Sequence, residues 1–214
     1  MPFTVEQFFA VFSRYNEAVW PAQAIAVIDA VIAIGAALHG GRRAGRLAAI
    51  VLAALWLWMG VVYHLQFFSR INPAAVVFAA AFVVEAGLLF WFGVVRGQLV
   101  FEPRRDTTGV LGAILLVYAL VIYPKLGSAL GHAYPAAPTF GLPCPTTIFT
   151  FGLLLWARPR VPFSLLIVPV LWAVVGSVAA LQLGVGEDAG LAVSALVALP
   201  LLVMHSRKLV PRPA

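Results

Sequence analysis

The chain has 214 residues, of which 63% are hydrophobic and only 10% are charged. Soluble domains are about a quarter charged, so this composition argues against a soluble protein and predicts a single all-α membrane helix bundle over residues 1–214. The net charge of +6 comes from short basic runs between apolar stretches, which argues against a nucleic acid partner and makes the lipid bilayer the expected surrounding.

A short amphipathic helix is predicted first, over residues 4–16. Thr4 and Gln7 have the spacing of a capping box. The apolar side is predicted to carry Val5, Phe8, Phe9, Phe12, Tyr15 and Val19, and the polar side Glu6, Gln7, Ser13, Arg14, Asn16 and Glu17. Such a helix either lies in the outer membrane interface or packs over the mouth of the bundle.

Seven apolar stretches follow, near residues 20–38, 47–65, 74–95, 107–123, 140–157, 161–183 and 189–205. A spanning helix needs roughly 20 mostly apolar residues to cross about 30 Å of hydrocarbon. The fifth stretch is the weakest, because its purely apolar part is only Ile148–Trp156. A re-entrant half-helix is the alternative there.

The basic residues favour seven spans with the N-terminus outside and the C-terminus in the cytoplasm. This arrangement leaves three basic residues outside, Arg14, Arg70 and Lys125. The other eleven then face the cytoplasm: Arg42, Arg43, Arg46, Arg96, Arg104, Arg105, Arg158, Arg160, Arg207, Lys208 and Arg212. Removing the fifth span would leave six basic residues inside and eight outside, against the positive-inside rule.

Two acids, Asp29 and Glu85, lie near the middle of the first and third predicted spans. A charge at the bilayer centre costs at least about 2.5 kcal/mol, and no basic residue lies at a comparable depth. We therefore expect at least one acid to be protonated at rest or to bind a cation. The alternative is a neutral acid that donates a hydrogen bond to a neighbouring helix.

A second group of polar residues is predicted at the outer face: His64, Asn72, His132 and Cys144. Cys144 stands between two prolines at the end of the longest predicted loop, which leaves its sulfur available as a ligand. Thiolate and imidazole suit Cu(I) or Zn(II), so His64, His132 and Cys144 are candidate metal ligands. No C-x-x-C or H-x-x-x-H spacing accompanies them, and a lone membrane cysteine is otherwise a small packing residue.

Several cofactor sites are not predicted. The final span has no lysine for a retinal Schiff base, and no glycine-rich nucleotide loop is present. A metal ion stays possible as a cofactor.

Three stretches carry a resemblance: FTVEQFFAVFSRYNEAVWPAQ, YHLQFFSRINPAA and FGLPCPTTIFTFGLLLW. Over nearly its full length the chain resembles a bacterial domain-of-unknown-function family of small integral membrane proteins. That resemblance implies a multi-pass protein of the bacterial inner membrane and implies no activity. The Pro-Cys-Pro at Cys144 is also similar to a motif of nickel/cobalt efflux proteins, whose histidine-rich loop is missing here.

The leading functional hypothesis is binding or transport of a small solute or ion, with a metal cation as one candidate. Its outer polar vestibule would use His64, Asn72, His132 and Cys144 and lead inward to Asp29 and Glu85. An alternative is a membrane enzyme that acts on a lipid or quinone at the outer leaflet, and a third is a structural protein without chemistry. A polar path to both acids would favour transport, and a lateral opening beside Cys144 would favour the enzyme.

Overall fold

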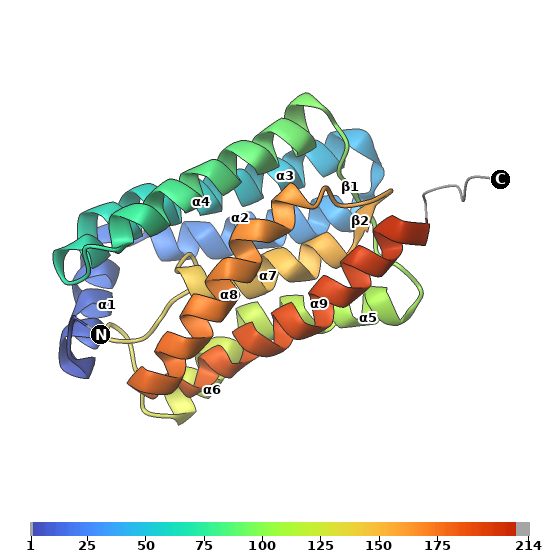
Figure 1. The fold of residues 1–214 in the computed structure, drawn as a ribbon. Helices are drawn as coiled ribbons and strands as arrows, with labels where there is room; N and C mark the ends of the chain where they lie inside the picture. Colours follow the sequence, from blue (N-terminus) through green and yellow to red (C-terminus); the bar gives the residue numbers. More distant parts are fainter. Residues whose placement is uncertain (1, 209–214) are drawn as a thin grey trace.

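The protein is an all-α helical bundle in the computed structural model, which describes residues 2–208 and their side chains as far as Met204 (Figure 1). The helices are α1 (Val5–Val19), α2 (Ala22–His39), α3 (Gly41–Trp58), α4 (Ala75–Leu89), α5 (Thr107–Val117), α6 (Tyr123–Ala129), α7 (Pro143–Leu155), α8 (Ser164–Leu183) and α9 (Ala189–Lys208). π-Helical turns extend α3 over Met59–Phe67, α4 over Phe90–Val95 and α5 over Tyr118–Ile122.

Six helical segments of the described chain are long and apolar enough to cross a bilayer. They are Ala22–His39, Gly41–Arg70, Ala75–Val95, Thr107–Ala129, Ser164–Leu183 and Gly186–Met204. Their outward sides carry large aliphatic residues, of which Leu181 is 87% exposed and Val77 is 69% exposed. A soluble protein does not expose apolar surface along every long helix, so these segments identify a multi-pass membrane protein.

The fifth predicted span is the central element of the bundle, α7, and it is shorter than predicted. Its 13 residues give a helix about 20 Å long, against about 30 Å of hydrocarbon. Every residue of α7 is buried except Cys144, which is half-buried, and α5, α8 and α9 pack around the helix. Residues 138–142 precede it as a largely buried non-helical segment, which is tolerated within a bilayer only where protein surrounds it.

The basic residues of the described chain gather mainly at one end of the bundle, which we call the arginine end. A two-stranded ladder of β1 (Val100–Phe101) and β2 (Ala157–Arg158) joins two connections there. The arginine end carries Arg42, Arg43, Arg46, Arg96, Arg104, Arg105, Arg158 and Arg160. The C-terminal Arg207, Lys208 and Arg212 lie outside the described side chains, so the predicted orientation and seven-span count stay predictions.

Helix α1 lies across the opposite end of the bundle, which we call the α1 end (Figure 1). The predicted capping box is present, since Thr4 and Gln7 hydrogen-bond reciprocally. Tyr15 is buried and accepts a 2.8 Å hydrogen bond from the indole of Trp58, and burial raises the pKa of its phenol to about 12. Asn16, assigned to the polar side by the helical pattern, is fully buried instead.

Candidate functional site

Two adjacent acids, Glu187 and Asp188, are buried at the α1 end in the turn Gly186–Asp188 between α8 and α9. We call them the acid pair. Nδ1 of His132 lies 2.9 Å from Oε1 and 3.0 Å from Oε2 of Glu187. The Tyr118 hydroxyl donates a 2.7 Å hydrogen bond to the backbone carbonyl of Glu187. Glu187 is therefore held by the loop that follows α6 and by the extension of α5.

Asp188 faces α6 and α7. The hydroxyl of Tyr123 donates to Oδ1 of Asp188, and the thiol of Cys144 interacts with the same carboxyl group. Asp188 directly precedes α9, whose N-terminal dipole favours a negative charge at this position. His132 can balance one carboxylate of the pair when it is protonated. A second buried carboxyl group is then either protonated or balanced by a bound cation.

An apolar pocket of about 370 Å³ lies beside the acid pair, between α1, α8 and the first turn of α7. Its walls include Phe3, Phe8, Phe12, Tyr63, Phe68, Phe78, Trp172, Val174, Val175 and Val178. Among the residues that the structure describes, Asp188 is the one lining residue with a formal charge, and Cys144 and Asn72 add polar atoms. Val174 and Val178 are exposed on the outward side of α8, so the pocket opens sideways, beside Cys144, toward the surrounding lipid.

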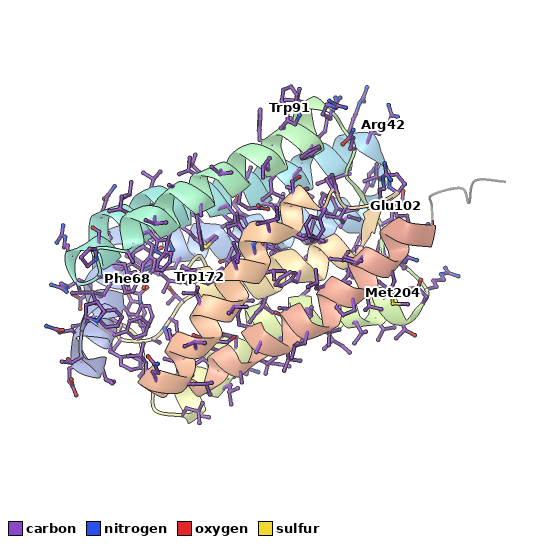
Figure 2. All side chains as sticks on the ribbon, viewed as in Figure 1. Arg42, Phe68, Trp91, Glu102, Trp172 and Met204 are labelled. Atoms are coloured by element: carbon purple, nitrogen blue, oxygen red, sulfur yellow. The ribbon has the colours of Figure 1, made fainter. Side chains whose placement is uncertain are left out.

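Unpaired polar groups lie against the wall of this pocket. The ring of His64 is enclosed by Phe82, Trp172 and other aromatic rings, at centroid distances of 4.6 and 5.2 Å for these two. Neither nitrogen of His64 has a hydrogen-bond partner in the described part of the chain. The indole N–H of Trp172 lies near the Cys144 thiol without a hydrogen bond of normal geometry. Figure 2 shows Trp172 and Phe68 toward the α1 end, far from Arg42 and Glu102.

Three of the predicted site residues meet at the α1 end. Cys144 and Asn72 line the same pocket, and His132 reaches it through the acid pair. Oδ1 of Asn72 also accepts a 3.1 Å hydrogen bond from the backbone of Ala74, which holds the start of α4. The pocket differs from the predicted polar vestibule because most of its wall is aliphatic and aromatic.

The two predicted intramembrane acids do not join this cluster. Asp29 is half-buried on α2, and no hydrogen bond or ion pair to it is found among residues 2–204. Glu85 is fully buried on α4, and within the same range both of its carboxyl oxygens lack a partner. Neither acid lines the pocket beside the acid pair. Their roles stay predictions.

The structure offers no preformed metal centre among the residues it describes. No three or more His, Cys, Asp or Glu side chains there are arranged to hold a metal ion. His64 is enclosed by aromatic rings, while His132 and Cys144 contact different members of the acid pair. The metal assignment to His64, His132 and Cys144 therefore stays a prediction without a described ligand set.

Sequence reasoning missed the acid pair and Tyr123. The predicted spans 161–183 and 189–205 leave Glu187 and Asp188 in the connection between them, whereas the structure buries both. A signal was present, because two of only eight acids stand side by side between glycines and no Lys or Arg occurs between Arg160 and Arg207. Tyr123 carried no comparable signal, since its partner Asp188 is 65 residues away.

Comparison with known proteins gives a family and no activity. No curated protein and no solved structure matches the chain. The model of a family described as a family of unknown function, DUF6064, matches residues 5–210, nearly the whole chain. The protein, a multi-pass membrane bundle with a buried acid pair beside a laterally open apolar pocket, therefore belongs to the DUF6064 family.

Proposed function

We propose that the protein binds an amphiphilic molecule in the pocket beside Cys144 and takes it from the surrounding lipid. The observation that carries this proposal is an apolar, laterally open cavity in which Asp188 is the one charged lining residue within the described chain. Its volume of about 370 Å³ falls within the range of roughly 300–1,000 Å³ for small-molecule sites. The aromatic wall would bury the apolar body of the ligand, and the polar groups around Asp188 would bind its head group.

The charge of the acid pair favours a ligand with a cationic or hydrogen-bond-donating head group. Glu187 has His132 as a partner, whereas Asp188 is contacted by the uncharged Tyr123 and Cys144. A cationic head group at Asp188 would balance the second carboxylate, and a hydroxyl group could donate to it. A ligand with a carboxylate or phosphate head would instead add a third negative charge.

We further propose that this pocket faces the outer leaflet of a bacterial inner membrane. The support is the distribution of basic residues, since the α1 end carries Arg14, Arg70 and Lys125 whereas the opposite end carries eight arginines. The positive-inside rule assigns the richer end to the cytoplasm. The ligand would then be taken up from the outer half of the bilayer.

Photolabelling tests the binding proposal. A long-chain alkylamine with a photoreactive group on its chain should label α8 and α1 of the purified protein in nanodiscs. Val174→Trp fills the pocket and should reduce labelling at least fivefold. Leu171→Trp is the matched control, because Leu171 is equally exposed on α8 but does not line the pocket. Equal labelling of both variants would refute the site.

Asp188→Asn tests the head-group preference. This variant should lose alkylamine labelling while it keeps labelling by an alkyl alcohol of the same chain length, because the amide still forms hydrogen bonds but carries no charge. Equal loss for both probes would point to a misfolded pocket, which the unfolding temperature of the variant would reveal. Equal retention of both would contradict the role of Asp188.

Chemical conversion of the bound molecule is a second candidate function. Cys144 and Asp188 line the pocket, and the hydroxyl of Tyr123 donates a hydrogen bond to Asp188 from behind this wall. The pocket opens to lipid beside Cys144. If the protein is such an enzyme, Cys144→Ala should abolish turnover of membrane lipids or quinones, measured by mass spectrometry, and retain photolabelling. Unchanged lipid and quinone profiles on overexpression would argue against it.

Ion transport is supported by one observation, the fully buried Glu85 whose carboxyl oxygens lack partners. If Glu85 binds a cation during transport, Glu85→Gln should abolish ion flux into proteoliposomes. If Glu85 is only a neutral packing residue, the nearly isosteric amide should leave both flux and stability unchanged.

A further inference from the structure

A large groove at the arginine end combines three arginines with an apolar wall. Its volume is about 810 Å³, and the arginines that line it are Arg42, Arg96 and Arg160. They come from three separate places: the first turn of α3, the residue after the π-helical end of α4, and the connection between β2 and α8. The fold therefore gathers positive charge from segments far apart in the sequence.

The charge of this groove is not balanced by the residues that form it. Among residues 2–204, no acidic side chain lines it. Within the described chain, none of its three arginines belongs to an ion pair, and the one pair found nearby joins Arg104 to Asp106. Guanidinium groups bind phosphate oxygens bidentately, so three unpaired arginines around one groove favour an anionic oxygen ligand with several acceptors.

The rest of the groove is apolar and continuous with the membrane-facing surface. Phe92, Leu166 and Val203 contribute to its wall, and Phe163, which is 66% exposed, stands at its edge. Ile167, one turn further along α8, is exposed on the same helix. A free phosphate would use the arginines and leave this wall unused, whereas a phospholipid would use both parts.

We propose that this groove binds the head group of an anionic phospholipid, with the phosphate at Arg42, Arg96 and Arg160 and an acyl chain against Phe92, Leu166 and Phe163. Basic pockets between membrane helices are suited to such head groups because charge attraction and acyl-chain burial act together. The site lies at the end of the bundle opposite the pocket beside Cys144. It is independent of that pocket and of the orientation of the protein.

The test compares the purified protein in nanodiscs of phosphatidylcholine alone and of phosphatidylcholine with phosphatidylglycerol. We expect the anionic lipid to raise the unfolding temperature, since a ligand of the folded state stabilises it. The variant with Arg42→Gln, Arg96→Gln and Arg160→Gln should lose most of this increase. By native mass spectrometry, its affinity for phosphatidylglycerol should fall about fivefold for each arginine removed.

The matched control removes the same charge at the other end through Arg14→Gln, Arg70→Gln and Lys125→Gln. This control variant should keep the full rise in unfolding temperature that phosphatidylglycerol causes. Equal loss in both triple variants would overturn the proposal, because it would show a non-specific surface effect. Should the groove variant fail to fold, Arg160→Gln alone gives the decisive comparison with Arg70→Gln, and equal affinities would overturn the site.

Two soluble probes separate a lipid site from a phosphate site. Inorganic phosphate and glycerol phosphate carry the charge of the head group without an acyl chain. We expect neither, at millimolar concentration, to reproduce the stabilisation by phosphatidylglycerol. If either soluble probe raised the unfolding temperature as much as phosphatidylglycerol does, the lipid assignment would be overturned and the groove would be a site for a soluble phosphate.

Discussion

Single polar side chains fix the α1 end, and Asn16 is the clearest case. Its Nδ2 donates hydrogen bonds of 2.7 and 2.8 Å to the carbonyls of Pro135 and Ala137, and its Oδ1 accepts from Thr139 at 2.7 Å. These bonds tie α1 to the long loop that delivers the chain to Cys144. An amide is needed here because it donates and accepts at once, which neither a carboxylate nor a methyl group can do.

We predict that Asn16→Ala lowers the free energy of unfolding by about 1–3 kcal/mol, because it leaves two part-buried carbonyls without this donor. Asn16→Asp should cost at least as much, since a carboxylate would face those carbonyls. Urea unfolding in detergent, followed by tryptophan fluorescence, measures both. Ser13→Ala is the control on the same helix, where the lost bond is a 3.3 Å contact to the Phe9 carbonyl. A similar cost in the control would contradict the role of Asn16.

The side chain of Asp106 gives a second prediction, which concerns how the stability of the protein depends on pH. This side chain accepts a 2.9 Å hydrogen bond from the backbone of Gly109 at the start of α5 and pairs with Arg104. The Gly109 hydrogen bond first, and then Arg104, lower the pKa of this carboxyl group. Because the folded-state pKa is lowered, its contribution to stability is present above the unfolded-state pKa and is lost as the pH falls through the folded-state value.

Asp106→Ala should therefore destabilise the protein by about 1 kcal/mol at neutral pH and by less in acid. Asp106→Asn keeps a capping oxygen and should show a smaller loss at neutral pH. Unfolding curves at pH 7 and pH 3 in the same detergent provide the measurement. A loss for Asp106→Ala that is the same at both pH values would rule out the titration of Asp106 as its cause.

At the scale of elements, the α5–α7 contact depends on two facing glycines, Gly112 and Gly152. A Cβ atom on Gly152 would lie 3.0 Å from the Gly112 carbonyl oxygen and 2.9 Å from Leu116. Small residues let membrane helices approach closely, and here they bring the short, buried α7 against its neighbour. Beside them, the indole of Trp156 donates a 2.9 Å hydrogen bond to the Gly109 carbonyl. Close packing and this hydrogen bond therefore hold the short helix α7 against α5.

Gly152→Ala should destabilise the protein by about 1–3 kcal/mol, because the added methyl group must push the backbone of α5 away. Gly87→Ala is the control within a long helix, since nothing lies within 4 Å of its added Cβ atom. That change should be neutral or stabilising by up to about 1 kcal/mol. Thermal unfolding in one detergent tests the pair, and an equal effect of the two substitutions would contradict this account of the crossing.

The long helices could be predicted from the sequence because hydropathy reports burial in lipid directly. The start of α1 could also be predicted, since Thr4 and Gln7 form a local motif. The acid pair stands out in the sequence, but its contacts could not be predicted, because the partners of Glu187 and Asp188 lie 55 and 65 positions away. The shortness of α7 was signalled by the sequence, since only Ile148–Trp156 of the fifth stretch is purely apolar, but its burial by α5, α8 and α9 was not, because those contacts join segments far apart in the chain.

At the scale of the whole molecule, the two ends of the bundle differ in chemistry. The α1 end holds the acid pair and an apolar pocket beneath an aromatic helix, whereas the other end holds eight arginines and a basic groove. Helix α7 and the extended segment before it connect these ends. The path of the chain through α7 therefore decides whether residues on its two sides face the same compartment.

Cysteine labelling tests this path together with the orientation. Cys144 is the only cysteine, so Cys144→Ser gives a background without thiols. In this cysteine-free background, Lys125→Cys should react with a membrane-impermeant maleimide on intact cells. Arg158→Cys should react only after permeabilisation, because α7 lies between the two positions.

Arg70→Cys and Arg105→Cys are the matched controls, one at each end, and their accessibility does not depend on α7. If positions 125 and 158 react from the same side while these controls react from opposite sides, α7 is re-entrant and the chain after it is inverted. If all four follow the expected pattern, the short central helix completes a seventh crossing, and the acid pair and its pocket face outward.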